Sequence, residues 1–244
     1  MVPAAPPMTM PSTISSKLTT EVSASVVATA MTMPTMPKIL PWRAVSGDDS
    51  PLSAKMNNTR VEELKGMKMR FFGLGARVMS RLGVSTQLIA GGDIFPALEK
   101  GVIDATEFSM PTMDLSYGFY QVAKYNYFPG WHQQSTASEL LMNKNKWEDL
   151  SSTAQALIRT TCNDAYLWSA IKSDADQPDA MAQLQSKGVT FVTWEDSELA
   201  KFKKAWEEEV AESSAADPLF AEVHKSYSDF RKKYAIWGDR AYLK

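Results

Sequence analysis

The residue best suited to anion chemistry is Arg70, which stands at the end of a short alternating segment. Every second residue from 67 to 71 is apolar, which is the periodicity of a strand, and Gly73 and Gly75 then allow a tight turn into a helix. An arginine at the carboxyl end of a strand reaches the crevice where open α/β sheets bind ligands. Its planar guanidinium pairs well with a carboxylate or a phosphate. The sequence therefore predicts anion recognition at Arg70, against the alternative of a salt-bridged surface arginine.

A regular succession of elements must position this arginine. Residues 92–101 have the pattern of a short helix that ends on a glycine, and residues 102–108 have the pattern of the strand that follows it. Strand, helix, strand, helix and strand thus succeed one another between Met67 and Phe108. This rhythm predicts a parallel sheet with crossover helices.

The rest of the chain predicts further strands and long helices. Pro111 fits the first turn of a helix over residues 110–117, and a cap at Ser151 or Ser152 predicts a long helix that runs to Lys187. The other expected elements are an aromatic strand over residues 124–131, strands over residues 138–143 and 189–193, and helices over residues 196–213 and 217–237.

Composition excludes several classes of function. The 26 basic residues do not outnumber the 28 acidic ones, so the chain has no global field that would attract nucleic acid. The chain contains no run of 18 apolar residues, so the sequence predicts no membrane-spanning segment. Cys162 is the single cysteine, which excludes an intrachain disulfide and a cysteine-built zinc site. His132 and His224 are the two histidines, too few for a histidine-rich metal site.

Residues 1–57 differ from the remainder. They are rich in methionine, proline, serine and threonine, and they show no strand or helix periodicity. We expect a low-complexity segment, either disordered or non-native, over residues 1–57 and an α/β domain over residues 58–244. Residues 23–30 are mildly apolar but lack the basic start and the long apolar core of a secretory signal.

A series of short motifs recurs in a recognisable order from about Asn58 to Lys244. These motifs are Val61-Glu-Glu-Leu-Lys-Gly-Met-Lys-Met-Arg70, Gly73-Leu-Gly, Arg81-Leu-Gly83, Gly92-Asp-Ile-Phe, Ala97-Leu98, Gly101-Val-Ile-Asp-Ala-Thr-Glu107, Pro129-Gly-Trp-His132 and Asn143-Lys144. In them the chain resembles the solute receptors of tripartite ATP-independent periplasmic (TRAP) transporters. The similarity is closest to the branch that binds 2-oxo acids and related small monocarboxylates.

The resemblance implies a periplasmic-binding-protein-like α/β fold. The chain would hold mainly the second lobe, a mixed or parallel sheet flanked by helices, together with the long C-terminal helices. The first lobe should precede Val61, so we expect a truncated form in which that lobe is missing or replaced. The resemblance also implies a noncatalytic periplasmic receptor that passes a 2-oxo or 2-hydroxy monocarboxylate to a TRAP membrane permease. A homodimer through the C-terminal helices is a further hypothesis.

The resemblance assigns three ligand-binding residues. Arg70 would clamp the ligand carboxylate with paired hydrogen bonds, and Phe108 and Trp131 would supply apolar walls. Phe108 stands where the branch commonly has tryptophan, which keeps a wall but loses an indole donor. In an empty site Arg70 would be an unpaired cation, so its replacement should weaken ligand binding and harm folding little.

The resemblance also implies a cation, sodium or calcium, that bridges to the ligand oxygens. Glu107, the backbone of Phe108 and Gln133 would hold it, with Glu139 in reserve, because a hard cation needs oxygen ligands. Gln133 stands where the branch often has glutamate, so we expect a weak or missing cation site. No cofactor is required.

Two other functions fit parts of the sequence. A nucleotide-dependent oxidoreductase would use the glycine-rich turn after residue 72, but Val78 takes the place of the third glycine and Asp93 begins a helix. An interaction fragment that binds no ligand is the other alternative. Thermal stabilisation separates these two functions from the receptor function. Pyruvate-like acids should stabilise a receptor, nicotinamide nucleotides should stabilise an oxidoreductase, and neither should stabilise an interaction fragment.

Overall fold

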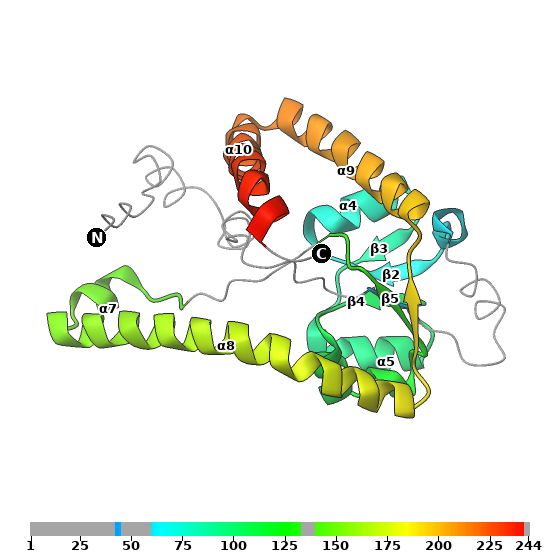
Figure 1. The fold of residues 1–244 in the computed structure, drawn as a ribbon, viewed down its shortest axis with the longest axis horizontal. Coiled ribbons are helices and arrows are strands. Elements are labelled where there is room, and N and C mark those ends of the chain that lie inside the picture. Colours follow the sequence, from blue (N-terminus) through cyan, green and yellow to red (C-terminus); the bar gives the residue numbers. More distant parts are fainter. Residues whose placement is uncertain (1–41, 45–59, 133–139, 242–244) are drawn as a thin grey trace.

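The computed structural model describes residues 42–44, 60–132 and 140–241 of the chain (Figure 1). For residues 42–44 it describes the backbone alone. These residues form a six-stranded sheet in the order β3-β2-β4-β1-β5-β6. The strands are β1 (Trp42–Ala44), β2 (Lys68–Arg70), β3 (Ser85–Gln87), β4 (Ala105–Glu107), β5 (Tyr125–Phe128) and β6 (Thr190–Thr193).

The helices follow the predicted local signals. Gly73 begins one helix with a φ of +59°, which is favourable for glycine, and Ser151 caps another by accepting a hydrogen bond from the Ala154 backbone N–H. The helical segments are η1 (Val61–Leu64), α4 (Gly73–Arg81), η2 (Gly91–Asp93), α5 (Ile94–Glu99), α6 (Pro111–Ser116), η3 (Phe119–Gln121), α7 (Lys144–Glu148), α8 (Ser152–Ser186), α9 (Asp196–Ala216) and α10 (Pro218–Ala241).

The predicted alternation of strands and helices around Arg70 is confirmed. The chain runs β2, α4, β3, α5, β4, and β2 pairs in parallel with both β3 and β4. β5 and β6 are also parallel to each other. Parallel strands of this kind need crossover connections, which α4 and α5 provide.

One strand corrects the expectation for the N-terminal segment. β1 belongs to residues 1–57, which were predicted to be irregular, yet it pairs antiparallel with β4 on one side and with β5 on the other. Its three residues occupy the middle of the sheet because the backbone hydrogen-bonding groups of both neighbours face it. The other residues of that segment lie outside the described ranges. The domain boundary between residues 57 and 58 therefore stays a prediction.

The strand expected over residues 138–143 is wrong for the four residues that the structure describes. Residues 140–143 have no regular structure, and the side chains of Leu140 and Leu141 are mostly exposed. Apolar residues form a strand only where a neighbouring element covers them. Asn143 instead caps α7, since its side chain accepts hydrogen bonds from the Asn145 and Lys146 backbone N–H groups.

Two apolar clusters flank the sheet. The larger one joins residues of β2 and β5 to α4 and α9, with Met69, Phe71, Tyr127 and Phe202 fully buried. The smaller one joins α5 and the segments around it, with Ile94 and Phe119 at its centre. In Figure 1, α4 and α9 lie on one side of the sheet, while α5 lies on the other.

The long helix α8 leaves the body of the molecule. Its second half packs against α6, where Gln177 hydrogen-bonds with Thr112, and buries Ala180 and Leu184. Its first half extends away from the sheet (Figure 1). That half exposes large apolar side chains, including Leu167, Trp168 and Ile171. In the part of the chain that the structure describes, no helix is both long and apolar enough to cross a membrane.

Candidate functional site

Arg70 is the last residue of β2 and is almost fully buried. Because side chains alternate along a strand, it faces away from the cluster that buries its neighbours Met69 and Phe71. The parallel pairing brings it next to Thr106 of β4, one residue before Glu107. The predicted arginine and the predicted acid therefore meet at adjacent strand ends.

The guanidinium of Arg70 is held on two of its three nitrogens. Its Nε donates to the carbonyl oxygen of Ile89 at 3.2 Å. Its Nη1 donates to the carbonyl oxygen of Glu107 at 2.7 Å and to Oε2 of the same residue at 3.0 Å. None of the described residues accepts a hydrogen bond from Nη2. The fork is thus fixed in place, with one end left for another acceptor.

This ion pair corrects the expectation that Arg70 is unpaired in the empty site. The side chains of Arg70 and Glu107 are 11% and 1% exposed, so both charges lie in a desolvated environment. A buried ion pair tolerates the loss of one partner poorly, because the other charge is left without compensation. The replacement of Arg70 should therefore harm folding as well as binding.

Glu107 has one oxygen that no hydrogen bond satisfies in the described part of the chain. Its Oε2 pairs with Arg70, while Oε1 is buried and lies 3.4 Å from Nε2 of His132. The His132 ring is also buried, and it meets the ring of Phe71 edge-on at 4.8 Å. Sequence reasoning assigned no role to His132, because its contact with Glu107 joins residues that are 25 positions apart in the chain.

Two phenyl rings flank the guanidinium. Its carbon lies 5.4 Å from the ring centre of Phe72 and 5.9 Å from that of Phe108, within the range of cation–π attraction. Phe108 is fixed by edge-to-face contacts with Tyr117 and Phe119 at 5.0 and 5.3 Å. The structure places Phe108 beside Arg70 as expected. The sequence reasoning assigned nothing to Phe72, although it follows Arg70 by only two residues.

Trp131 has the contacts of a core residue. Its ring stacks on Phe202 of α9 with ring centres 4.9 Å apart, and on Phe71 at 5.9 Å. Both neighbours belong to the larger apolar cluster. A role for Trp131 as a ligand wall stays a prediction.

Two predicted cation ligands, Gln133 and Glu139, lie outside the described residues. Within the described ranges, no group of three or more His, Cys, Asp and Glu side chains could hold a metal ion. Oε1 of Glu107 nevertheless suits a hard cation, since it is a buried carboxylate oxygen that accepts no hydrogen bond from any described residue.

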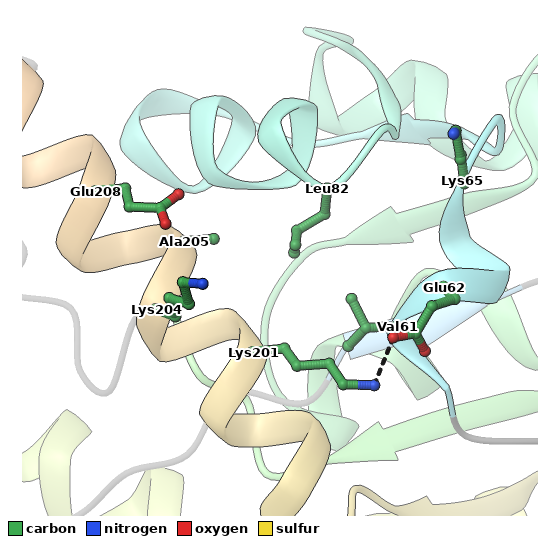
Figure 2. Close-up of a pocket in the computed structure, with 8 residues that line it drawn as sticks. All are labelled: Val61, Glu62, Lys65, Leu82, Lys201, Lys204, Ala205 and Glu208. Atoms are coloured by element: carbon green, nitrogen blue, oxygen red, sulfur yellow. Dashed lines mark hydrogen bonds and ion pairs between the residues drawn. The ribbon is translucent and has the colours of Figure 1, made fainter.

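A separate pocket of about 350 Å³ lies between η1, α4 and α9 (Figure 2). Its rim is charged, and Lys201 Nζ pairs with Glu62 Oε1 across it at 2.6 Å. Hydrogen bonds to Glu62 and Glu198 raise the pKa of Lys201. The lining contains none of the predicted site residues: it consists of Val61, Glu62, Lys65, Leu82, Lys201, Lys204, Ala205 and Glu208.

Comparison with known proteins identifies a family that matches most of this chain. Residues 37–217 match the model of the bacterial extracellular solute-binding protein family 7. A monocarboxylate 2-oxoacid-binding periplasmic protein of Nostoc sp. is 34% identical over 177 residues, which cover 72% of this chain and 49% of that protein.

Solved structures of TRAP transporter solute-binding proteins share the fold. One from Bordetella bronchiseptica, a dimer with calcium and picolinate, is 30% identical with a TM-score of 0.70, over 82% of this chain and 56% of that one. Another from Colwellia psychrerythraea, with bound calcium and pyruvate, is 28% identical with a TM-score of 0.72, over 85% of this chain and 63% of that one. The chain spans less than two thirds of the length of each of these three relatives.

Proposed function

Because the chain belongs to the bacterial extracellular solute-binding protein family 7, we propose that it acts as the receptor part of a TRAP transporter and binds a small organic carboxylate. The relatives are solute-binding proteins and not enzymes, and we extend the noncatalytic role to this chain. The observation that carries the proposal is the buried guanidinium of Arg70, which is fixed at Nε and Nη1 and has no hydrogen-bond acceptor for Nη2 among the described residues. The family match favours this function over a nucleotide-dependent oxidoreductase.

The ligand class follows from the relatives and from the chemistry at Arg70. The Nostoc protein is named for monocarboxylate 2-oxo acids, and the Colwellia structure holds pyruvate. We propose a 2-oxo or 2-hydroxy monocarboxylate whose carboxylate accepts from Nη2 of Arg70, a charge-assisted hydrogen bond in a desolvated setting. Phe108 would form one wall beside the ligand, and Trp131 would form another.

A bridging cation is the finer part of the proposal. Calcium accompanies the ligand in both relatives with solved structures described above. In this chain Glu107 Oε1 and the backbone carbonyl of Phe108 would hold a sodium or calcium ion, with Gln133 and Glu139 as further ligands. When bound, such an ion supplies positive charge to the ligand oxygens. Since Gln133 is uncharged, ligand binding should depend only weakly on the cation.

The proposal also covers the cellular compartment of the receptor and its membrane partner. Family 7 proteins are extracellular solute-binding proteins, and we place this one in the periplasm, where it would pass its ligand to TRAP membrane permease subunits.

We also propose a homodimer through the long helices. Exposed apolar residues on α8, such as Trp168, and on α10, such as Trp237, are the surfaces such a contact would cover. A monomer mass by light scattering at high protein concentration would contradict the dimer.

Calorimetric titration of the full chain with pyruvate and with lactate tests the ligand-binding function. We expect saturable binding, and Arg70→Lys should weaken it about tenfold, because an ammonium keeps the charge but cannot hold Glu107 and the ligand with one rigid plane. The matched control is Arg60→Lys, whose side chain is 68% exposed. Each titration is run with calcium and again with a chelator.

The outcomes separate the parts of the proposal. If neither acid binds to the unmodified chain, the carboxylate-receptor function is wrong. If both bind but Arg70→Lys and Arg60→Lys leave the affinity equally unchanged, the assignment of Arg70 fails. A large loss of affinity on chelation would contradict the weak cation dependence.

A further inference from the structure

We infer that the surroundings of Arg70 select carboxylates that carry an aromatic ring, with Phe72 as the specificity-determining residue. This inference rests on the proposed function, since it concerns the tail of the ligand whose carboxylate Arg70 would bind. It goes beyond that function because a small 2-oxo acid such as pyruvate has no ring. Three features of the described residues support it.

The first feature is how little of Arg70 is left for the ligand. Ile89 and Glu107 already accept hydrogen bonds from Nε and Nη1, so a carboxylate meets Nη2 alone. A two-pronged contact would need Glu107 to move, and that carboxylate is buried. Contact through one nitrogen gives less affinity than the paired geometry. Further affinity must therefore come from other parts of the ligand.

The second feature is the pair of phenyl rings that flank the guanidinium. Phe108 is packed against Tyr117 and Phe119, and it sits beside Gly91, where an added Cβ would lie only 3.2 Å from its ring. This ring is therefore a fixed part of the wall. Because both rings lie within 6 Å of the guanidinium carbon, a ligand at Nη2 comes close to aromatic surface.

The third feature is that Phe72 is the ring still open to a partner. It lies in extended backbone just before α4, which fixes where its side chain begins. Its side chain is 37% exposed, and it makes no ring-to-ring contact with another described aromatic residue. Tyr117, which packs on Phe108, is 43% exposed as well. An aromatic ligand ring would cover apolar surface here and gain the offset or edge-on contact that aromatic pairs favour.

The test compares ligands with the same head and different tails. Pyruvate, phenylpyruvate and 4-methyl-2-oxopentanoate share the 2-oxo carboxylate, and each is titrated into the full chain by calorimetry. We expect phenylpyruvate to bind at least about tenfold more tightly than pyruvate, and more tightly than the branched aliphatic acid. Phe72→Leu should lower the ratio of phenylpyruvate affinity to pyruvate affinity by about three- to tenfold, the range expected for one aromatic pair.

The control variant is Phe230→Leu, the same change on α10, where Phe230 stacks on Tyr234. Circular dichroism verifies that both variants fold. Equal affinity for pyruvate and phenylpyruvate would overturn the inference and leave the carboxylate receptor standing. Equal affinity for the aromatic and aliphatic tails would replace ring selectivity by general apolar selectivity. A preference that survives Phe72→Leu would overturn the role of Phe72, and no binding of any acid would overturn the proposed function together with the inference.

Discussion

At the scale of single residues, the central feature is a buried pair of opposite charges at the ends of two adjacent strands. Arg70 Nη1 lies 3.0 Å from Glu107 Oε2, and Glu107 is 1% exposed. Each charge lowers the cost of burying the other, so the two side chains stabilise each other's position more than they stabilise the fold. The pair holds the guanidinium in a fixed orientation, which is the preorganisation that a ligand contact needs.

This pairing predicts that the two residues are energetically coupled. Arg70→Ala should lower the free energy of unfolding by about 3–5 kcal/mol, because Glu107 would remain buried without its partner. The double variant Arg70→Ala/Glu107→Gln should be about 2 kcal/mol more stable than Arg70→Ala alone, since the orphaned charge is gone. Urea unfolding followed by circular dichroism measures both differences. The single variant Glu107→Gln completes the double-mutant cycle, and strictly additive effects of the two single changes would show that the pair contributes no coupling.

At the scale of elements, α4 and α9 pack through apolar residues and also share ion pairs centred on one buried acid, Glu209. Glu209 accepts from Arg81 at 2.7 Å and from Ser213 at 2.9 Å, and Arg77 pairs with it at 2.6 Å. Burial alone would raise the pKa of the Glu209 carboxyl. The hydrogen bonds from Arg81 and Ser213, together with the charges of Arg77 and Arg81, outweigh burial, so the pKa lies below its ordinary value of 4.5.

The lowered pKa gives the α4–α9 contact a defined pH dependence. A carboxyl whose folded pKa is depressed contributes its stability above its unfolded value and loses it as the pH falls through the folded pKa. Glu209→Gln should therefore destabilise the protein by about 2 kcal/mol at pH 7 and by progressively less as the pH falls below 4.5. Thermal unfolding of both proteins between pH 7 and 3 measures the difference.

The control for this prediction is Glu207→Gln on the same helix. Its side chain is 63% exposed and lies 3.9 Å from Lys203, so its loss should change stability little at any pH. A destabilisation by Glu209→Gln that stays constant down to pH 3 would mean that the carboxyl acts by shape and not by charge.

At the scale of the whole molecule, the sequence predicted the elements whose signals are local. Alternation before Arg70 and the glycines after it define β2 and α4, and the Ser151 cap defines the start of α8. β1 carried no such signal. Its three residues stand in a segment rich in methionine and proline, and they become a strand only through pairing with β4 and β5, more than 60 residues further along.

The same distinction holds for the candidate site. Residue types and strand ends predicted that Arg70, Glu107 and Phe108 belong together, because parallel neighbours bring their carboxyl ends to one edge. The ion pair itself and the approach of His132 depend on which strands are adjacent and on how side chains turn, and neither is encoded in local periodicity.

The position of β1 predicts how the molecule responds to shortening. β1 is the strand that joins the β3-β2-β4 half of the sheet to the β5-β6 half, so its removal leaves unpaired backbone groups on β4 and β5 in the middle of the sheet. A fragment of residues 58–244 should therefore unfold at a clearly lower urea concentration than the full chain, or aggregate through the freed strand edges. A fragment of residues 37–244, which begins where the family match begins, retains β1 and should unfold like the full chain. Identical midpoints for the two fragments would show that β1 contributes nothing to the stability of the sheet, and the domain boundary would then lie at residue 58 as its composition predicts.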